Sequence, residues 1–356
     1  MNIAEPARTI IEAALQAPSG ENSQPWLFKV DDNKIELYHD LHSDTSLYNF
    51  ENRGSLLAHG AAIENMCIAA AALGYMSKVS VFPTPAHSEH VATIIFTVSK
   101  KNLDAESLNQ VISQRTSNRK PYKVDPLMPE HVDALLSAAQ SFVAEGLQYQ
   151  RITQKGQIQA LAVVAATNEE VMLQNRELHQ FFFSHLSWTK AEDAQKKVGF
   201  YIKTLELPPP ARALFKLMRH WRVMSLFIKI GFPAVVRATN AKTDAAAGEY
   251  GIITTERDTP ESLVQTGRMM QRIWLTATKS GLQMQLMTGT LYLHHAAQKT
   301  PQAFSSHEHA LLNVQMEKLY SMLEKKRAVV VCMFRVGYGE KATARATRYT
   351  PEERLV

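Results

Sequence analysis

The chain has 356 residues, 45% of them hydrophobic, a formal net charge of +5 and a pI near 9.0. This length and composition indicate a globular protein with one large domain or two of ordinary size, and they exclude disordered and collagen-like classes. The modest positive charge permits an anionic ligand without requiring nucleic acid. The sequence contains no zinc-finger, helix-turn-helix or RNA-binding signature, so we expect no nucleic-acid partner.

Residues 17–26, APSGENSQPW, form a polar loop near the N-terminus. They follow a helical pattern, EPARTIIEAALQA, and precede a predicted strand, WLFKV. Proline and glycine end helices, and serine and asparagine satisfy backbone groups in turns, so a simple turn is one interpretation. A loop that contacts a ligand is the other.

The two cysteines indicate a reducing compartment. Cys67 and Cys332 both lie in apolar runs, where free buried thiols are usual. The first residues contain an early glutamate and no apolar stretch of signal-peptide length. The apolar run at 223–236 is short and is interrupted by Lys229 and Pro233, so it cannot span a bilayer as a helix. We therefore expect a cytoplasmic protein.

Two segments, GAAIENMCIAAAALGY (60–75) and GRMMQRIWLTATKSGL (267–282), share one plan. Each has a glycine, an apolar stripe at helical spacing, and a second glycine at the same distance. This plan predicts two long buried helices, each ending at a glycine C-cap.

Each half of the chain also has a predicted helix followed by a strand, at 10–30 and at 132–153, and an apolar closing strand, at 90–98 and at 327–339. We therefore predict an α+β protein with two related modules in tandem, residues 1–105 and 106–356. The second module carries an additional segment at about 176–245. The loop at 17–26 has no counterpart in the second module.

The additional segment is basic and amphipathic, with Lys216, Arg219, Arg222, Lys229 and Arg237 among Phe, Leu, Trp and Ile. A helical hairpin with its basic face in water is the first interpretation. A lid over a pocket is the second. A helix lying on an anionic membrane is the least favoured, so membrane contact is not expected.

Two further segments are rich in arginine. In RTSNR, Arg115 and Arg119 flank the hydroxyls of Thr116 and Ser117, a combination suited to a phosphate group. In the C-terminal tail, Arg345 and Arg348 follow a strand and a glycine turn. A charged linker and a solvated basic tail are the alternatives.

Together these segments resemble the FMN-dependent nitroreductase superfamily. RTSNR is similar to its R-[RH]-S-x-[RK] phosphate motif, with Thr116 where Arg or His is usual, and APSGENSQPW resembles its A-P-S-x-x-N-S-Q-P-W loop. The tail resembles the closing strand, G-Y turn and phosphate-binding Arg of that superfamily. RGSLLAHGAAIENMCIAAAALGYMSKVSVFP and TPESLVQTGRMMQRIWLTATKSGL are similar to two helices of its Acg-like branch, in which two nitroreductase modules are fused. This chain departs from the superfamily at two further positions. The usual Trp beside Leu263 is missing, and Thr288 stands where classical members have an acidic residue.

The resemblance implies a nitroreductase-like fold, a tandem pseudo-dimer whose antiparallel-rich sheets are flanked by helices. Because only the first module has APSGENSQPW and only the second has R-x-S-x-R, it implies one FMN site per chain, between the modules. GLQMQLMTG falls where the family places a backbone N–H facing flavin N5. The implied cofactor-binding residues are Pro18, Ser19, Asn22, Arg115, Thr116, Ser117, Arg119, Met287, Thr288, Gly289, Arg345 and Arg348.

The implied chemistry needs no catalytic side-chain acid or base. We expect an FMN-dependent oxidoreductase in which NAD(P)H reduces the flavin and a nitroaromatic or quinone-type small molecule reoxidises it. The alternative is a flavin-sequestering or redox-sensing protein whose additional segment covers the flavin. Gln24, Pro25 and Trp26 are expected to anchor the loop to the strand behind it. The oligomeric state stays open.

Other chemistries have weaker signals. His294, His295, His307 and His309 cluster in sequence, but no carboxylate or cysteine completes a ligand set at metal spacing, so no metal site is expected. No G-x-G-x-x-G follows a strand, no phosphate-binding G-x-x-x-x-G-K-[ST] occurs, and no G-x-S-x-G is present. A nicotinamide cofactor would therefore bind transiently over the flavin.

Overall fold

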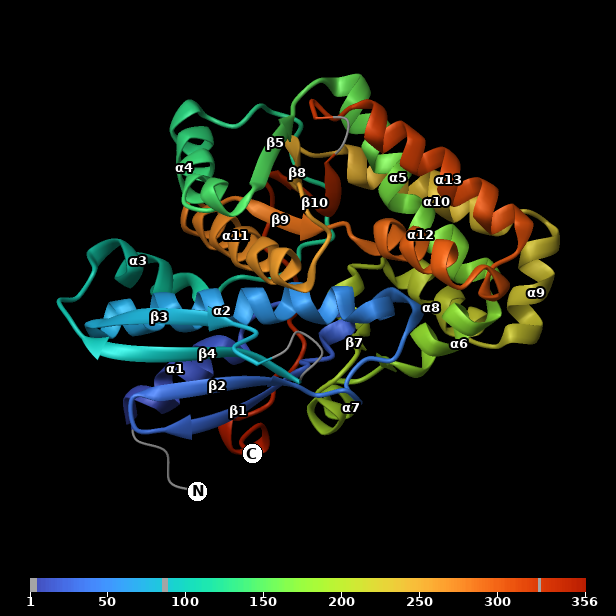
Figure 1. Cartoon of the computed structure of the whole chain (residues 1–356). Coiled ribbons are helices and arrows are strands. Elements are labelled where there is room, and N and C mark those ends of the chain that lie inside the picture. The colour runs from blue at the N-terminus through green and yellow to red at the C-terminus, as the bar shows by residue number, and fades with distance from the viewer. Residues whose placement is uncertain (1–4, 85–88, 326–327) are drawn as a thin grey trace.

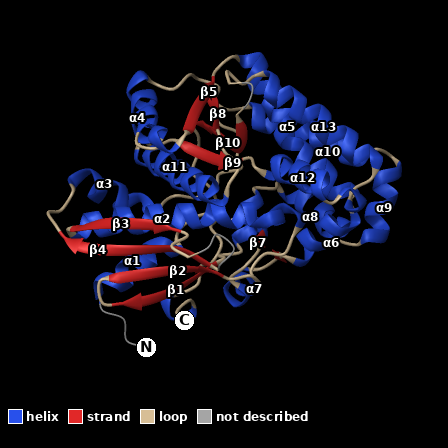
Figure 2. Cartoon of the chain, in the orientation of Figure 1, coloured by secondary structure: helices blue, strands red, loops and turns tan. Residues whose placement is uncertain are grey.

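A computed structural model describes residues 5–84, 89–325 and 328–356, and shows two sheets with helices around and between them (Figures 1 and 2). The first module contains one antiparallel sheet of strand order β1-β2-β4-β3. Its main elements are α1 (Glu5–Leu15), β1 (Trp26–Asp31), β2 (Lys34–His39), α2 (Arg53–Leu73), β3 (Tyr75–Val81), β4 (His90–Val98) and α3 (Leu103–Ile112).

The second module contains a sheet of strand order β5-β8-β10-β9, also antiparallel. Its main elements are α4 (Pro129–Gln140), β5 (Leu147–Ile152), α5 (Lys155–Gln174), β8 (Glu249–Thr255), α11 (Pro260–Lys279), β9 (Gln283–Leu286), α12 (Gly289–Lys299), α13 (Ser306–Ser321) and β10 (Val329–Gly337). In both sheets the strands stand in the order first, second, fourth, third along the chain. The helices and the two antiparallel sheets confirm the predicted α+β fold, whereas the division into two related modules stays a prediction.

The additional segment between α5 and β8 is mostly helical. It contains α6 (Arg176–Ser184), β6 (Leu186–Ser187), α7 (Lys190–Lys196), β7 (Phe200–Tyr201), α8 (Pro209–Met218), α9 (Trp221–Lys229) and α10 (Phe232–Ala245). The two short strands pair in parallel. The segment is therefore more elaborate than a helical hairpin. In Figure 1, β7 lies near the centre with α7 below it, and α9 lies at the right-hand edge.

The two repeated helices, α2 and α11, pack directly on each other through their first glycines. A Cβ atom on Gly60 would lie 2.0 Å from the Val264 carbonyl oxygen, and one on Gly267 would lie 2.1 Å from the Leu57 carbonyl oxygen. Only glycine allows two helix backbones to approach this closely. The second glycines, Gly74 and Gly281, adopt φ values of 89° and 73° just after the helices end, as a glycine C-cap requires.

The helix pair also contains polar contacts between the modules. The Glu64 carboxylate on α2 is fully buried and is paired with Arg268 and Arg272 on α11. Beside it, the Gln271 amide donates to the Asn65 side-chain oxygen at 2.7 Å. A buried carboxylate left without its partners is costly, so these pairs favour one arrangement of the two helices over others.

Helix α2 is largely apolar because it is enclosed on all sides. The stretch Leu47–Leu73 is the one helical stretch in the described residues whose length and hydropathy would suit a membrane span, and 83% of its most apolar window is buried inside the protein. One hydrophobic core runs through the helix pair and joins the modules, with Trp26 and Ile63 from the first and Trp274 and Val331 from the second.

The C-terminal tail crosses back to the first module. The Phe28 N–H of β1 donates to the Arg354 carbonyl at 2.8 Å, and the Val356 N–H donates to the Phe28 carbonyl at 3.0 Å. The tail therefore extends the first sheet at its β1 edge and passes beside the loop at 17–26. The module boundary at residues 105 and 106 stays a prediction, and α3 runs through it.

The glycine contact predicts a large effect of one methyl group. Gly60→Ala places a Cβ against backbone atoms of α11 that cannot move away, so we expect the free energy of unfolding to fall by about 3 kcal/mol or more. Urea unfolding of the purified protein measures this change. Gly156→Ala on α5, where an added Cβ meets nothing within 4 Å, is the matched control and should be neutral or slightly stabilising. Equal stability of both variants would contradict the close contact.

Candidate functional site

The loop at 17–26 is held in an uncommon backbone conformation. Glu21, Asn22 and Gln24 have φ values of 47°, 57° and 51°, in the left-handed region that favours glycine. The Gln24 N–H donates to the Ser19 hydroxyl at 3.0 Å and so closes the turn. Such strain persists only where surrounding contacts impose it, and it concentrates at functional sites.

Those contacts come from the second module. The Asn22 amide donates to the carbonyls of Lys197 and Thr347 at 2.8 and 3.0 Å, and its oxygen accepts from Arg348. The Gln24 amide donates to the Lys197 carbonyl at 2.7 Å, and its oxygen accepts from the Tyr349 N–H at 3.0 Å. The loop is thus fixed by the additional segment and by the tail.

Two of the three residues that we expected to anchor the loop to the strand behind it do so. The three are Gln24, Pro25 and Trp26. Trp26 is fully buried in β1, and the Pro25 carbonyl accepts from the Asp40 N–H at the end of β2. The expectation was wrong for Gln24, because its side chain bonds the tail and the additional segment instead.

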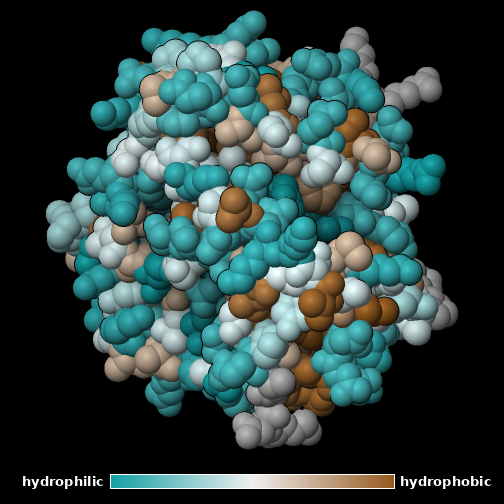
Figure 3. Space-filling model, turned by 90° about the vertical axis from the view of Figure 1, so that its left-hand side faces the viewer, coloured by the Kyte–Doolittle hydropathy of each residue, from teal (hydrophilic) through white to brown (hydrophobic). Residues whose placement is uncertain are grey.

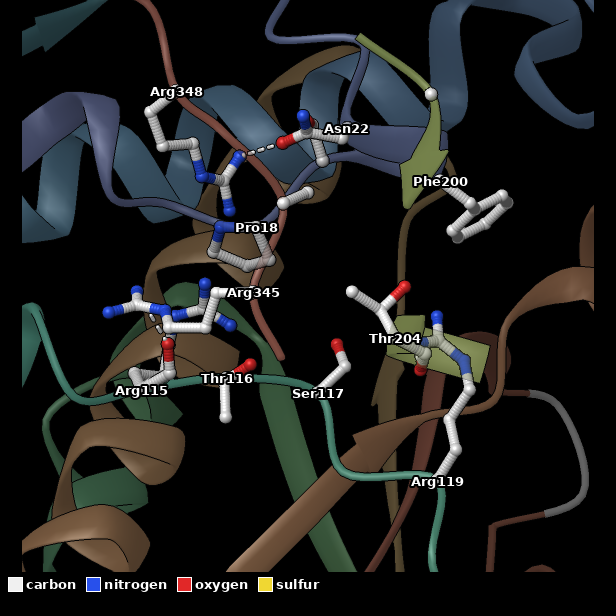
Figure 4. Close-up of a pocket in the computed structure, with 13 residues that line it drawn as sticks. Pro18, Asn22, Arg115, Thr116, Ser117, Arg119, Phe200, Thr204, Arg345 and Arg348 are labelled. Carbon is white, nitrogen blue, oxygen red and sulfur yellow. Dashed lines mark hydrogen bonds between the residues drawn. The ribbon is translucent and has the colours of Figure 1, made fainter. Parts of the chain in front are cut away.

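The RTSNR segment lies beside β9 of the second sheet. Ser117 forms an isolated parallel bridge with Met284, and the buried Asn118 amide donates to the Gln283 side chain and to the Glu340 carbonyl. These bonds fix the segment against β9. From there the side chains of Arg115, Ser117 and Arg119 reach the pocket shown in Figure 4.

Arg115 is buried with most of its hydrogen-bonding capacity unused. Its side chain is 2% exposed and lies over the Trp274 ring, 4.4 Å from the ring centre. One nitrogen, Nη2, donates to the Gln16 carbonyl at 3.0 Å, but Nε and Nη1 have no partner in the described structure. Buried donors are almost always satisfied, so these two indicate a missing acceptor.

Arg345 and Arg348 lie close to Arg115 (Figure 4). Arg345 donates to the Arg115 carbonyl at 3.0 Å. Burial, followed by the charges of Arg348 and Arg345, lowers the pKa of Arg115 well below its ordinary value. Burial and the neighbouring Arg345 lower the pKa of Arg348 to about 9. Three like charges therefore share a poorly solvated site.

Among the described residues that line this pocket, no carboxylate balances the charges. The carboxylate charge that acts on Arg348, and that favours its charged form, is that of Asp193 on α7. That carboxylate is buried and already bonded to Lys190 and Thr347, so little of its charge is available to the arginines. Buried cations without a counter-ion are costly, and an anion entering the pocket would offset that cost.

The other end of the pocket is formed with the additional segment. The Arg119 guanidinium donates to the Thr204 carbonyl at 2.9 Å and lies 5.3 Å from the Phe200 ring centre. Figure 4 shows this group apart from the three-arginine end. Gly199 allows the turn into β7, because it has φ 83° and a Cβ there would lie 1.9 Å from the His185 carbonyl oxygen.

The pocket brings together nine of the twelve residues that the sequence indicated for the cofactor. They are Pro18, Ser19, Asn22, Arg115, Thr116, Ser117, Arg119, Arg345 and Arg348. Sequence reasoning missed four further lining residues, Gly199, Phe200, Thr204 and Ala346. The first three belong to the part of the additional segment that precedes its basic helices, where no motif marks them.

Met287, Thr288 and Gly289 do not line this pocket. The Met287 N–H donates to the Met333 carbonyl at 2.8 Å, and Gly289 begins α12 against Asn168 of α5. These residues follow β9, beginning three residues after the Met284 that bridges Ser117. At about 3.3 Å per strand residue, Met287 lies roughly 10 Å beyond Met284 along the strand.

Helix α5 connects this segment with the pocket. Asn168 packs against Gly289, and its side-chain oxygen is buried without a hydrogen-bond partner in the described structure. The next residue, Glu169, interacts electrostatically with Arg119. Burial, followed by the charge of Asp244, raises the pKa of Glu169 to about 8. No sequence motif marked Glu169 as a site residue.

Other reactive groups lie outside this region. Among the described residues, no cluster of three or more His, Cys, Asp or Glu side chains has the arrangement of a metal site. His295 pairs with Glu51, and His294 bonds Asn313. Cys67 is half-buried and Cys332 is buried, both as free thiols, and burial raises the pKa of both.

With this geometry established, comparison with known proteins defines the class. Residues 112–338 match the model of the nitroreductase family, and the chain belongs to that family. The matched region begins just before RTSNR and ends at the glycine turn after β10. The resemblance inferred from the sequence is thus confirmed.

Three Mycobacterium tuberculosis proteins are similar in sequence. "Putative NAD(P)H nitroreductase acg" is 25% identical over 297 residues, 81% of each chain, in agreement with the Acg-like branch. The "Uncharacterized protein MT1398" is 25% identical over 80% of this chain, and the match spans 39% of that protein. "Putative NAD(P)H nitroreductase MT3217" is 31% identical over 35% of this chain and 36% of its own length. The chain thus spans well under half of the length of the last two.

Solved structures of the family are similar over most of their length. The FMN-dependent nitroreductase NfnB from Mycobacterium smegmatis, solved with NADPH, is 14% identical and covers 71% of this chain and 97% of its own, with a TM-score of 0.39. A nitroreductase-like protein from Bacillus cereus is 13% identical and covers 70% and 94%, with a TM-score of 0.36.

The raised pKa of Glu169 predicts a pH-dependent stability. Between its ordinary value of 4.5 and about 8, the unfolded chain has lost a proton that the folded protein retains, so stability falls as pH rises through this range. Glu169→Gln removes the carboxyl group that takes up this proton. We expect wild-type protein to lose about 2–4 kcal/mol of unfolding free energy relative to the variant between pH 5 and about pH 8.

Urea unfolding across this pH range measures the difference. Glu177→Gln, at an exposed glutamate on α6, is the matched control and should run parallel to wild type. Parallel curves for wild type and Glu169→Gln would contradict a proton held on Glu169.

Proposed function

We propose that the protein is an FMN-dependent oxidoreductase in which NAD(P)H reduces the bound flavin and a nitroaromatic or quinone-type acceptor reoxidises it. The observation that carries the proposal is the group of three pocket arginines, the buried Arg115 and the half-buried Arg345 and Arg348, with no carboxylate among the described lining residues. Two nitrogens of Arg115 lack partners in the described structure. A phosphate monoester supplies two negative charges and several acceptor oxygens. Membership of the nitroreductase family supports this type of activity, and the name of one relative supports NAD(P)H as the reductant.

The residues present fit the phosphate of FMN in charge, because three arginines meet in the pocket. Arg115, Arg345 and Arg348 would hold the phosphate, with the Ser117 hydroxyl as an additional donor. The loop at 17–26, fixed through Asn22, would close the other side. Residues 287–289 lie further along β9, in the direction in which the flavin ring would extend from the phosphate. Their placement at the flavin N5 stays part of the proposal.

Bound FMN would accept and donate hydride at N5. The protein's own contribution is positioning and charge. Arg119 holds a positive charge at the end of the pocket away from the phosphate group, where negative charge develops on a reduced flavin. Its bond to the Thr204 carbonyl and its contact with Phe200 fix that charge in place. We place the protein in the reducing cytoplasm, in keeping with its free thiols.

A second candidate is a flavin-sequestering or redox-sensing protein. It is favoured by the additional segment, because Gly199, Phe200 and Thr204 line the pocket and the Lys197 carbonyl bonds the loop. A cover fixed by these bonds would restrict access of nicotinamide to the flavin. The two candidates share one binding site and differ in the rate at which NAD(P)H reaches it.

Anaerobic mixing of the purified yellow protein with NADPH, and separately with NADH, tests the proposal. We expect rapid bleaching of the flavin absorption band, because the proposed reaction transfers hydride from NAD(P)H to the bound flavin. Persistent yellow colour would contradict the proposed enzyme activity and favour sequestration. In that case the flavin of the Phe200→Ala variant should bleach faster than that of wild type. The flavin of Phe181→Ala, a variant outside the pocket, should not. A colourless protein that binds no added FMN would contradict both candidates.

A further inference from the structure

The turn between α9 and α10 carries an exposed group of basic and apolar side chains. We define the basic corner as Arg222, Leu226, Lys229, Ile230 and Val235. Leu226, Ile230 and Val235 are 62%, 75% and 57% exposed, and the two cations are also exposed. The chain reverses there at Gly231, with φ 74°, and an added Cβ would meet nothing within 4 Å. The basic corner therefore protrudes from the body of the protein.

The exposed residues of α9 form one stripe. Positions 222, 226, 229 and 230 lie on the same side of an α-helix, because helical neighbours recur every three to four residues. The opposite side of α9 packs inward and includes the fully buried Met224. The solvent side thus alternates cations with large aliphatic groups, where a helix on the surface of a globular protein normally presents polar groups alone.

The charge around the basic corner is of one sign. Residues 207–243 contain no Asp or Glu, and they contain seven cations, Arg212, Lys216, Arg219, Arg222, Lys229, Arg237 and Lys242. Arg237 is paired with Glu170 at 2.8 Å. Among the described residues, no carboxylate forms an ion pair with Lys216, Arg219, Arg222 or Lys229. These four charges remain available to an external anionic surface.

We propose that the basic corner docks on the surface of an anionic lipid bilayer. Such a surface attracts Lys and Arg side chains and also accepts aliphatic groups just below its headgroups. The corner offers both, because its three aliphatic groups and its two cations are all exposed. Nucleic acid would use the charges but gains nothing from Leu226, Ile230 and Val235. Membrane contact was the least favoured of the three interpretations of the additional segment, because the sequence does not show that these apolar residues face solvent.

Exposed apolar residues alone do not carry the proposal. Figure 3 shows the opposite end of the molecule, where brown apolar residues are also exposed among hydrophilic ones. Val98 and Leu103, before and within α3, are 82% and 77% exposed beside Lys100 and Lys101. There, however, Asp104 and Glu106 follow at once. That group, at the far end of Figure 1 from α9, provides a matched control.

Flotation of the full-length protein with lipid vesicles tests the docking. We expect it to bind vesicles of phosphatidylcholine mixed with phosphatidylglycerol, and not vesicles of phosphatidylcholine alone. Binding should fall steeply at about 1 M salt, where the screening length is about 3 Å. Arg222→Gln with Lys229→Gln should weaken binding by more than tenfold, at about fivefold per charge. Leu226→Ser with Ile230→Ser should weaken it by at least tenfold.

The control pairs are Lys100→Gln with Lys101→Gln and Val98→Ser with Leu103→Ser, which should bind like wild type. Thermal unfolding and flavin content check that every variant is folded. Absence of binding to the anionic vesicles, or binding that neither corner pair changes, would overturn the proposal. Loss of binding with the charge pair but not with the aliphatic pair would also overturn it, and would indicate a general polyanion surface such as that of an acidic protein. Because the readout is lipid binding, failure here leaves the proposed flavin chemistry untouched.

Discussion

Arg115, Arg345 and Arg348 place three positive charges in one pocket, and none of the described residues that line it is a carboxylate. Much of the surrounding architecture serves to bring these charges together. RTSNR reaches the pocket because Ser117 and Asn118 dock on β9. Arg345 and Arg348 reach it because the tail continues across to β1 of the first module. A folded chain tolerates such a group when a ligand supplies the opposite charge.

The two modules contribute unequally to this pocket although their sheets have the same strand order. The contact of Gly60 with α11 and of Gly267 with α2 gives the interface an approximately symmetric centre. Symmetric modules would make two equal sites. Here the first module supplies the strained loop and the second supplies the arginines, so the residues assembled in this pocket make one site. Asn22 of the first module connects the two parts, since its side chain forms hydrogen bonds with Lys197, Thr347 and Arg348 of the second module.

The sequence predicted the parts of this structure that depend on local spacing. The paired glycines of the two long helices, the loop at 17–26 and the arginine spacing of RTSNR each reflect a constraint within a few residues, and all could be read directly. Phe200 and Thr204 could not, because their place in the pocket depends on a two-stranded parallel ladder and on Lys197 bonding a loop 173 residues away.

The roles of the additional segment likewise depend on contacts that are distant in the sequence. Its many cations suggested one role for the whole stretch, but the structure separates it into a part that lines the pocket and a basic corner that points away. The partner of Gln24 was missed for the same reason, since the tail returns from the end of the chain. Glu169 carries no motif, and its proton is held by burial that only the folded chain creates.

The affinity of the protein for FMN after loss of two pocket arginines tests the central claim most directly. Equilibrium titration of flavin-free protein with FMN compares wild type, Arg115→Ala with Arg348→Ala, and the exposed control Arg222→Ala. Each lost charge-assisted phosphate contact contributes about 1.5 to 3 kcal/mol, so the account predicts a fall in affinity of at least a hundredfold for the pair and no change for the control. Unchanged affinity of the double variant would contradict the placement of the phosphate among the three pocket arginines.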